Sequence, residues 1–127
     1  MKFLMIALGG GIGALLRYGI SGLTYRFMDG GFPWGTLAVN LLGCFFIGFL
    51  WVIFERTILP PSGRDFIFIG LLGALTTFST YGFETVNLLR DGEFRQALMN
   101  FALNNLLGVA LVLAGMFLAA KLWVAFR

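Results

Sequence analysis

Four apolar stretches dominate the chain, and each is long enough to cross a lipid bilayer. They run over residues 2–27, 34–54, 66–89 and 96–124, with only short polar connectors between them. A transmembrane helix needs about 20 apolar residues. A chain of 127 residues then has little left for a domain outside the membrane. We therefore predict an all-α membrane protein in which residues 1–127 form one membrane domain with four transmembrane helices.

The composition excludes several other classes of protein. With 59% hydrophobic and 12% charged residues, the chain does not resemble a soluble domain. The net charge is +3, but the nine Lys and Arg residues are scattered singly, which argues against a nucleic-acid partner. Histidine is absent and Cys44 is the single cysteine, so the sequence offers no usual zinc site and no intrachain disulfide. No combination of residues suggests an enzyme.

The third apolar stretch is interrupted by residues that a continuous helix uses poorly. Between positions 70 and 83 it contains Gly70, Gly73 and Gly82 and the hydroxyls of Thr76, Thr77, Ser79 and Thr80. Glycine lowers helix propensity, and hydroxyl side chains compete for main-chain hydrogen bonds. Irregular backbone at membrane depth is tolerated only where protein buries it or where it lines a wet cavity. We predict that the third helix is broken in mid-membrane and that an ion or substrate site lies there.

The basic residues give only a weak preference for one orientation in the membrane. With four spans, both termini and the 55–65 loop share a side. That side carries Lys2, Arg56, Arg64, Lys121 and Arg127, and the opposite side carries Arg26, Arg90 and Arg95, with Arg17 as a possible fourth. Because the Lys and Arg difference between loops sets orientation, this near balance suggests that the chain can insert both ways.

Span one combines a packing motif with a deep charge. Gly9-x-x-x-Gly13 is typical of helices whose backbones approach closely. Arg17 lies deep enough that it must reach the interface, pair with an acid or face a wet vestibule. Glu84 is a candidate structural partner, and an anion-attracting role is the alternative.

Carboxamides form two further polar stripes. Thr36 and Asn40 lie four residues apart and so share one helix face, as do Asn100 and Asn104. A mid-membrane asparagine either joins helices through hydrogen bonds or donates to an ion on a pathway. Both interpretations remain open, and the two stripes could meet.

Three motifs in the first three spans resemble the signatures of the Fluc (CrcB-type) fluoride channels. They are Gly10-x-x-Gly13-Ala-x-x-Arg-Tyr18, Gly35-Thr-x-x-x-Asn40-x-x-Gly43 and Gly70-x-x-Gly73-x-x-Thr-Thr-Phe-Ser-Thr80. The resemblance implies a fluoride-selective channel that exports fluoride passively and lowers its toxicity in the cytoplasm. It also implies a multi-pass protein of the inner (plasma) membrane that assembles as an antiparallel, dual-topology homodimer in the lipid bilayer.

The resemblance further implies roles for individual residues. The family's pore phenylalanines correspond to Phe78 and Tyr81, and its other pathway residues correspond to Asn40, Thr36, Ser79 and Thr80. A central sodium ion would be held by the main-chain carbonyls of Gly73 and Thr76. Tyr81 departs from the usual phenylalanine, and its hydroxyl could donate to the anion or narrow the path. Without the family resemblance, the sequence leaves two roles open for Phe78: it could offer an electropositive ring edge to an anion, or it could fill a core.

Two other functions stay open at this stage. A small dual-topology, proton-coupled multidrug transporter fits the length and the charge balance. Such a transporter needs a carboxylate in its first span, and residues 3–27 contain none, so Glu84 is the plausible substitute. A helical subunit without transport activity would explain the hydrophobicity, but not the grouping of glycines, hydroxyls and aromatic rings in one broken helix.

Overall fold

The computed structural model describes residues 1–28 and 30–125. Arg127, one of the basic residues counted above for membrane orientation, lies outside the described residues. The described chain contains four helical segments that are long and apolar enough to cross a membrane. They comprise Lys2–Phe27, Trp34–Glu55, Pro61–Arg90 and Phe94–Ala125. The predicted all-α architecture with four membrane-capable helices is thereby confirmed.

The first two segments are single helices and the other two are composite. Helix α1 (Lys2–Phe27) and helix α2 (Trp34–Glu55) are continuous. The third segment consists of α3 (Pro61–Arg64), the π-helical η1 (Asp65–Leu72), α4 (Gly73–Leu75) and α5 (Phe78–Arg90). The fourth consists of α6 (Phe94–Ala102), the π-helical η2 (Leu103–Leu107) and α7 (Gly108–Ala125).

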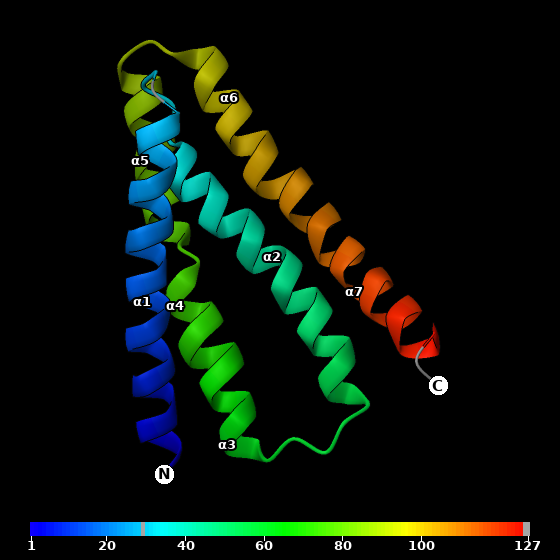
Figure 1. Ribbon diagram of the computed structural model, residues 1–127. Helices are drawn as coiled ribbons and strands as arrows, with labels where there is room; N and C mark the ends of the chain where they lie inside the picture. Colours follow the sequence, from blue (N-terminus) through cyan, green and yellow to red (C-terminus); the bar gives the residue numbers. More distant parts are fainter. Residues whose placement is uncertain (29, 126–127) are drawn as a thin grey trace.

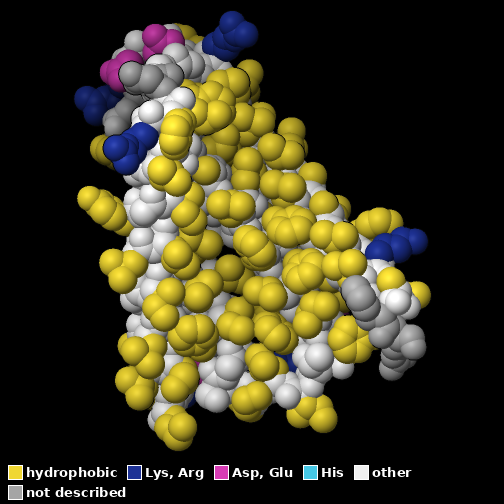
Figure 2. Space-filling model, viewed as in Figure 1, with side chains coloured by type: hydrophobic (Ala, Val, Ile, Leu, Met, Phe, Trp, Pro, Cys, Tyr) yellow, Lys and Arg dark blue, Asp and Glu magenta, His cyan; other side chains and the backbone are white. Residues whose placement is uncertain are grey.

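The helices alternate in direction along the bundle. The start of α1, the α2–α3 connector and the end of α7 lie toward one end, and the α1–α2 and α5–α6 connectors lie at the other (Figure 1). The visible Lys, Arg, Asp and Glu side chains gather toward the ends, while apolar side chains cover the surface between them (Figure 2). This distribution suits a bundle whose middle is surrounded by lipid.

Close backbone contacts join α1 to the third segment. Gly9 and Gly13 are both buried. A Cβ atom added at Gly9 would collide with the main-chain oxygen of Phe66, and one added at Gly13 would collide with that of Leu71. The predicted packing role of the Gly9-x-x-x-Gly13 motif is therefore confirmed.

The fourth segment is joined to α2 in the same way. A Cβ atom at Gly48 would collide with the main-chain oxygen of Val112, and one at Gly115 would collide with that of Phe45. Cys44 is half-buried at this contact, where its sulfur would lie 3.3 Å from a Cβ atom added at Gly108. The bundle thus holds α2 between the fourth segment and the rest of the chain (Figure 1).

The third segment is broken at two residues. Helix α4 ends at Leu75, Thr76 and Thr77 have extended backbones (ψ 158° and 115°), and α5 begins at Phe78. The predicted break in the third helix is therefore present, and it is short. The hydroxyls of Ser79 and Thr80 belong to the first turn of α5 rather than to the irregular backbone.

Candidate functional site

The side chain of Asn40 pairs with the main chain at the break. The Thr77 N–H donates to Asn40 Oδ1 over 2.8 Å, and Asn40 Nδ2 donates to the Thr77 carbonyl over 3.2 Å. In a continuous helix, the Thr77 N–H would instead donate to the carbonyl of Gly73. Asn40 therefore satisfies the interrupted backbone and leaves the Gly73 carbonyl without its usual helical donor.

Thr77 is also the cap of the helix that restarts the span. Its side-chain oxygen accepts a hydrogen bond from the main-chain N–H of Thr80 over 3.3 Å. Its hydroxyl donates to Thr80 Oγ1 over 3.0 Å and lies 3.4 Å from Ser79 Oγ. An oxygen at this position satisfies one of the free N–H groups of the first turn. The run of hydroxyls thus has a structural role in starting α5.

A chain of carboxamides ties the break to the fourth segment. Asn40 Nδ2 donates to Asn104 Oδ1 over 2.9 Å, and Asn104 Nδ2 donates to Asn100 Oδ1 over 2.9 Å. Asn100, which is fully buried, donates in turn to Thr85 Oγ1 over 2.9 Å. The two polar stripes do meet, and their asparagines join three helices through hydrogen bonds.

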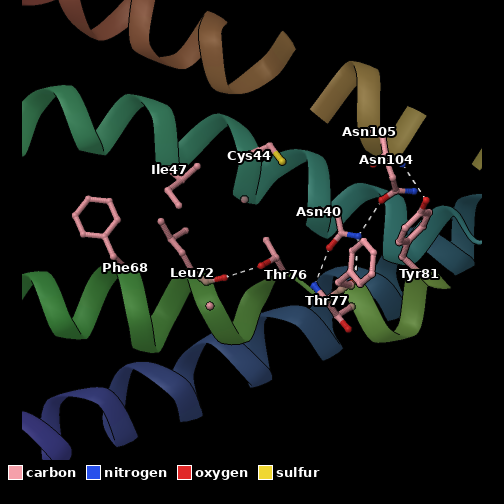
Figure 3. A pocket seen from close by; sticks show the side chains of 13 residues that line it. Asn40, Cys44, Ile47, Phe68, Leu72, Thr76, Thr77, Tyr81, Asn104 and Asn105 are labelled. Atoms are coloured by element: carbon pink, nitrogen blue, oxygen red, sulfur yellow. Dashed lines mark hydrogen bonds between the residues drawn. The ribbon is translucent and has the colours of Figure 1, made fainter. Parts of the chain in front are cut away.

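A cleft of about 300 Å³ opens beside the break (Figure 3). Its apolar wall includes Ile47, Phe68 and Leu72. Its polar wall is formed by α2, the break, the first turn of α5 and the fourth segment, through Asn40, Thr76, Thr77, Tyr81, Asn104 and Asn105. Gly73 and Phe78 border the same cleft, so most of the predicted site residues are brought together here.

The two predicted pore aromatics lie in very different surroundings. The rings of Phe78 and Tyr81 are 5.3 Å apart at an interplanar angle of 63°. Phe78 is 80% exposed, whereas Tyr81 is 6% exposed. Phe78 is therefore not a packed core residue of the single chain, and its side chain is accessible at the break.

A second and larger cleft, of about 1040 Å³, lies on the other side of the break. It is lined by Arg17, Arg26, Thr36, Thr77, Thr80 and Glu84, among others. Thr36 and Asn40 share a face of α2, yet Thr36 borders this cleft and Asn40 the smaller one. Thr77 borders both, so the break separates the two spaces.

The structure does not support the pairing of Arg17 with Glu84. Within residues 1–28 and 30–125 no ion pair joins them, and Glu84 Oε1 accepts instead from the buried Thr36 hydroxyl over 2.8 Å. The second carboxylate oxygen of Glu84 is buried and has no hydrogen-bond partner among the described residues. Arg17 lines the large cleft, and its vestibule role stays a prediction.

The fourth segment contributes more to the site than the sequence analysis assigned to it. Asn104 and Asn105 both line the smaller cleft, and Asn105 Nδ2 donates to the Tyr81 hydroxyl oxygen over 2.9 Å. Adjacent carboxamides within an apolar span were the available signal, because a polar side chain inside a membrane is a functional candidate by default.

Four membrane-capable helices in the described part of the chain, one of them broken beside two clefts, define a small helical membrane protein of the channel and transporter class. Residues 4–116 match the sequence model of the family described as CrcB-like protein, Camphor Resistance (CrcB). The chain belongs to this family.

Curated relatives extend this similarity over nearly the whole chain. A protein of Salinibacter ruber is 50% identical over 115 residues, which cover 91% of this chain and 86% of the relative. A protein of Maridesulfovibrio salexigens is 43% identical over 116 residues, covering 91% and 92% of the two chains. One of Parabacteroides distasonis is 40% identical over 122 residues, covering 96% and 95%. Each of the three is named fluoride-specific ion channel FluC.

The role of Asn40 at the break can be tested by Asn40→Ala. The change leaves both main-chain groups of Thr77 and the side-chain oxygen Oδ1 of Asn104 without their partner. We expect the free energy of unfolding in detergent to fall by about 2–4 kcal/mol. Asn87→Ala is the control, because the Asn87 side chain makes no hydrogen bond within the described residues, and its effect should stay below about 0.5 kcal/mol. Equal effects of the two changes would contradict this role.

Proposed function

We propose that the chain is a fluoride-selective ion channel that exports fluoride passively across the cytoplasmic membrane and so lowers its toxicity. Family membership and the names of the relatives support this function. The structural observation that carries it is the start of α5, which lies at the break between the two clefts. The first N–H groups of a helix lack helical acceptors, and this end carries partial positive charge. An anion is the ion that such a site favours.

A fluoride path needs donors that replace the ion's tightly held water. The exposed hydroxyls of Ser79 and Thr80 and the ring edge of Phe78 surround the start of α5. Ring edges are electropositive and can lie against an anion. The path would also run past Tyr81, Asn40 and Thr36, with Arg17 drawing anions into the large cleft. No acid or base chemistry is required, so the protein would act as a channel and not as an enzyme.

The break also supports assembly of two copies in opposite orientations. Phe78, Ser79 and Thr80 are exposed in the single chain although they adjoin irregular backbone. Such backbone needs a protein or water covering in the membrane, and a second copy would supply it. The near balance of Lys and Arg between the two ends permits both insertions. We place this dimer, built from one membrane domain per chain, in the inner membrane.

A central sodium ion fits the acceptors freed at the break. Within the described residues no group of three His, Cys, Asp or Glu side chains could hold a metal ion. The Gly73 carbonyl has lost its helical donor to Asn40, and the extended Thr76 carries its carbonyl out of the helix. Oxygen ligands of this kind suit a hard cation. The carbonyls of Gly73 and Thr76 would hold it, and its charge would offset repulsion between anions nearby.

Fluoride efflux from liposomes, followed with a fluoride electrode, tests the proposed function. The wild-type chain should release fluoride and retain chloride. Phe78→Ile keeps apolar bulk but removes the electropositive ring edge, so fluoride efflux per folded protein should fall by about tenfold or more. An inert wild-type chain would rule out the channel, and wild-type efflux from Phe78→Ile would remove that residue from the ion path.

Dual topology can be measured by labelling a single cysteine. A reporter cysteine added after the C-terminus, in a Cys44→Ala background, should react with an impermeant thiol reagent from both sides of the membrane. Several lysines added to the 55–65 loop should bias insertion toward one orientation and reduce fluoride efflux. A reporter that reacts from one side alone in intact cells, in fully active protein, would contradict the antiparallel dimer.

The sodium proposal predicts that main-chain geometry matters more than the Thr76 side chain. Thr76→Ser retains the hydroxyl and should leave fluoride efflux within about twofold of wild type. In crystals grown with a heavier monovalent cation in place of sodium, anomalous scattering should mark the position near the Gly73 and Thr76 carbonyls. Water alone at that position would refute the site.

A further inference from the structure

Asn105 and Tyr81 form a polar contact that the fourth segment makes with the break. Asn105 lies in η2 and Tyr81 in the first turn of α5, and both line the smaller cleft (Figure 3). Asn105 Nδ2 lies 2.9 Å from the Tyr81 hydroxyl oxygen and 2.8 Å from the Phe101 carbonyl oxygen. The same nitrogen therefore has two oxygen neighbours.

These two neighbours fix the direction of the hydrogen bond to Tyr81. A carbonyl oxygen can only accept, so the Asn105 atom near Phe101 must be the amide nitrogen and not the amide oxygen. Its two hydrogens then serve Phe101 and Tyr81. The Tyr81 oxygen is the acceptor in this contact, and its own proton is left for another partner.

The other polar side chains of the cleft already donate their hydrogen bonds to acceptors within the protein. Asn40 Nδ2 donates to Thr77 and Asn104, and both hydrogen bonds of Asn104 Nδ2 go to Asn100. The Thr76 hydroxyl donates to the Leu72 carbonyl, and that of Thr77 donates to Thr80. The Tyr81 hydroxyl differs from these donors. Within residues 1–28 and 30–125, it is the one side-chain hydroxyl or amide group lining this cleft whose proton has no acceptor in the protein.

We propose that Asn105 is a positioning residue that orients the Tyr81 hydroxyl so that its proton is donated to an anion in the cleft. This inference rests on the proposed fluoride channel function and assigns the anion a specific donor. The buried ring of Tyr81 is held against Phe78, so the Asn105 amide controls where the hydroxyl proton points. The anion would meet the ring edge of Phe78 and the hydroxyl of Tyr81 at one place.

The test is the concentration of fluoride at which initial efflux from liposomes reaches half of its maximum. Tyr81→Phe keeps the ring and removes the donor, so the half-saturating concentration should rise by about tenfold, as expected for one lost hydrogen bond to a charged group. Asn105→Leu should raise it by about threefold or more, because the hydroxyl can then turn away from the cleft. Asn87→Leu is the matched control and should leave it unchanged, since the Asn87 side chain makes no hydrogen bond within the described residues.

The double variant separates positioning from an independent effect. If Asn105 acts through the hydroxyl, Asn105→Leu should add nothing in the Tyr81→Phe background. Independent, multiplying effects would overturn the inference, as would an unchanged half-saturating concentration in Tyr81→Phe. Wild-type protein without fluoride efflux would overturn the proposed function itself, whereas active wild type with unaffected variants would overturn this inference alone.

A variant that does not fold is recognised by size-exclusion chromatography before reconstitution. Should Asn105→Leu fail there, Asn105→Asp replaces it, because the carboxylate accepts the Tyr81 proton and turns it away from the cleft while keeping the contact. Its effect in the Tyr81→Phe background then measures the added negative charge alone. A larger effect in the wild-type background supports positioning, and an equal effect overturns it.

Discussion

The structure depends on how one interrupted stretch of backbone is satisfied inside a membrane. The Thr76 N–H still donates to the Leu72 carbonyl, but at Thr77 the third span loses its helical hydrogen bonding, and water is not available in hydrocarbon to replace it. Asn40 provides both a donor and an acceptor to Thr77. A carboxamide can do this because it carries both functions on one planar group. The break is therefore held by α2, and its position is set by the contact between two spans.

That contact also divides the space around the break. The smaller cleft lies on the side of the carboxamides, and the larger lies on the side of Arg17 and Glu84. The start of α5 stands between them with its partial positive charge. Because Phe78 and the neighbouring hydroxyls remain exposed in one chain, the surface at the break is the part of the bundle that most needs a covering. The proposed dimer and the proposed ion path follow from the same exposed segment.

The rest of the bundle gives this site a rigid support. Glycines bring α1 against η1 and α2 against α7 until main-chain atoms touch, which leaves little freedom to slide. The buried Asn100 and its neighbours then link the fourth segment to both α2 and α5. Polar pairs of this kind in a nonpolar bundle fix the register of the helices, because a shift would leave carboxamides unpaired. The fourth segment thereby orients side chains at a break that lies in another span.

The sequence by itself determined the four helical spans, the interruption of the third and the close packing at Gly9 and Gly13, because these follow from local hydrophobicity and from residues that cannot continue or separate helices. The motifs around Asn40 and Phe78 also indicated the family to which the chain belongs. Only the tertiary structure decided that Glu84 pairs with Thr36 and not with Arg17, and that Asn105 donates a hydrogen bond to the Tyr81 hydroxyl oxygen. Hydrogen-bond partners in different spans depend on the rotation and depth of each helix. Those quantities are set by packing across the whole bundle, and a local sequence pattern does not contain them.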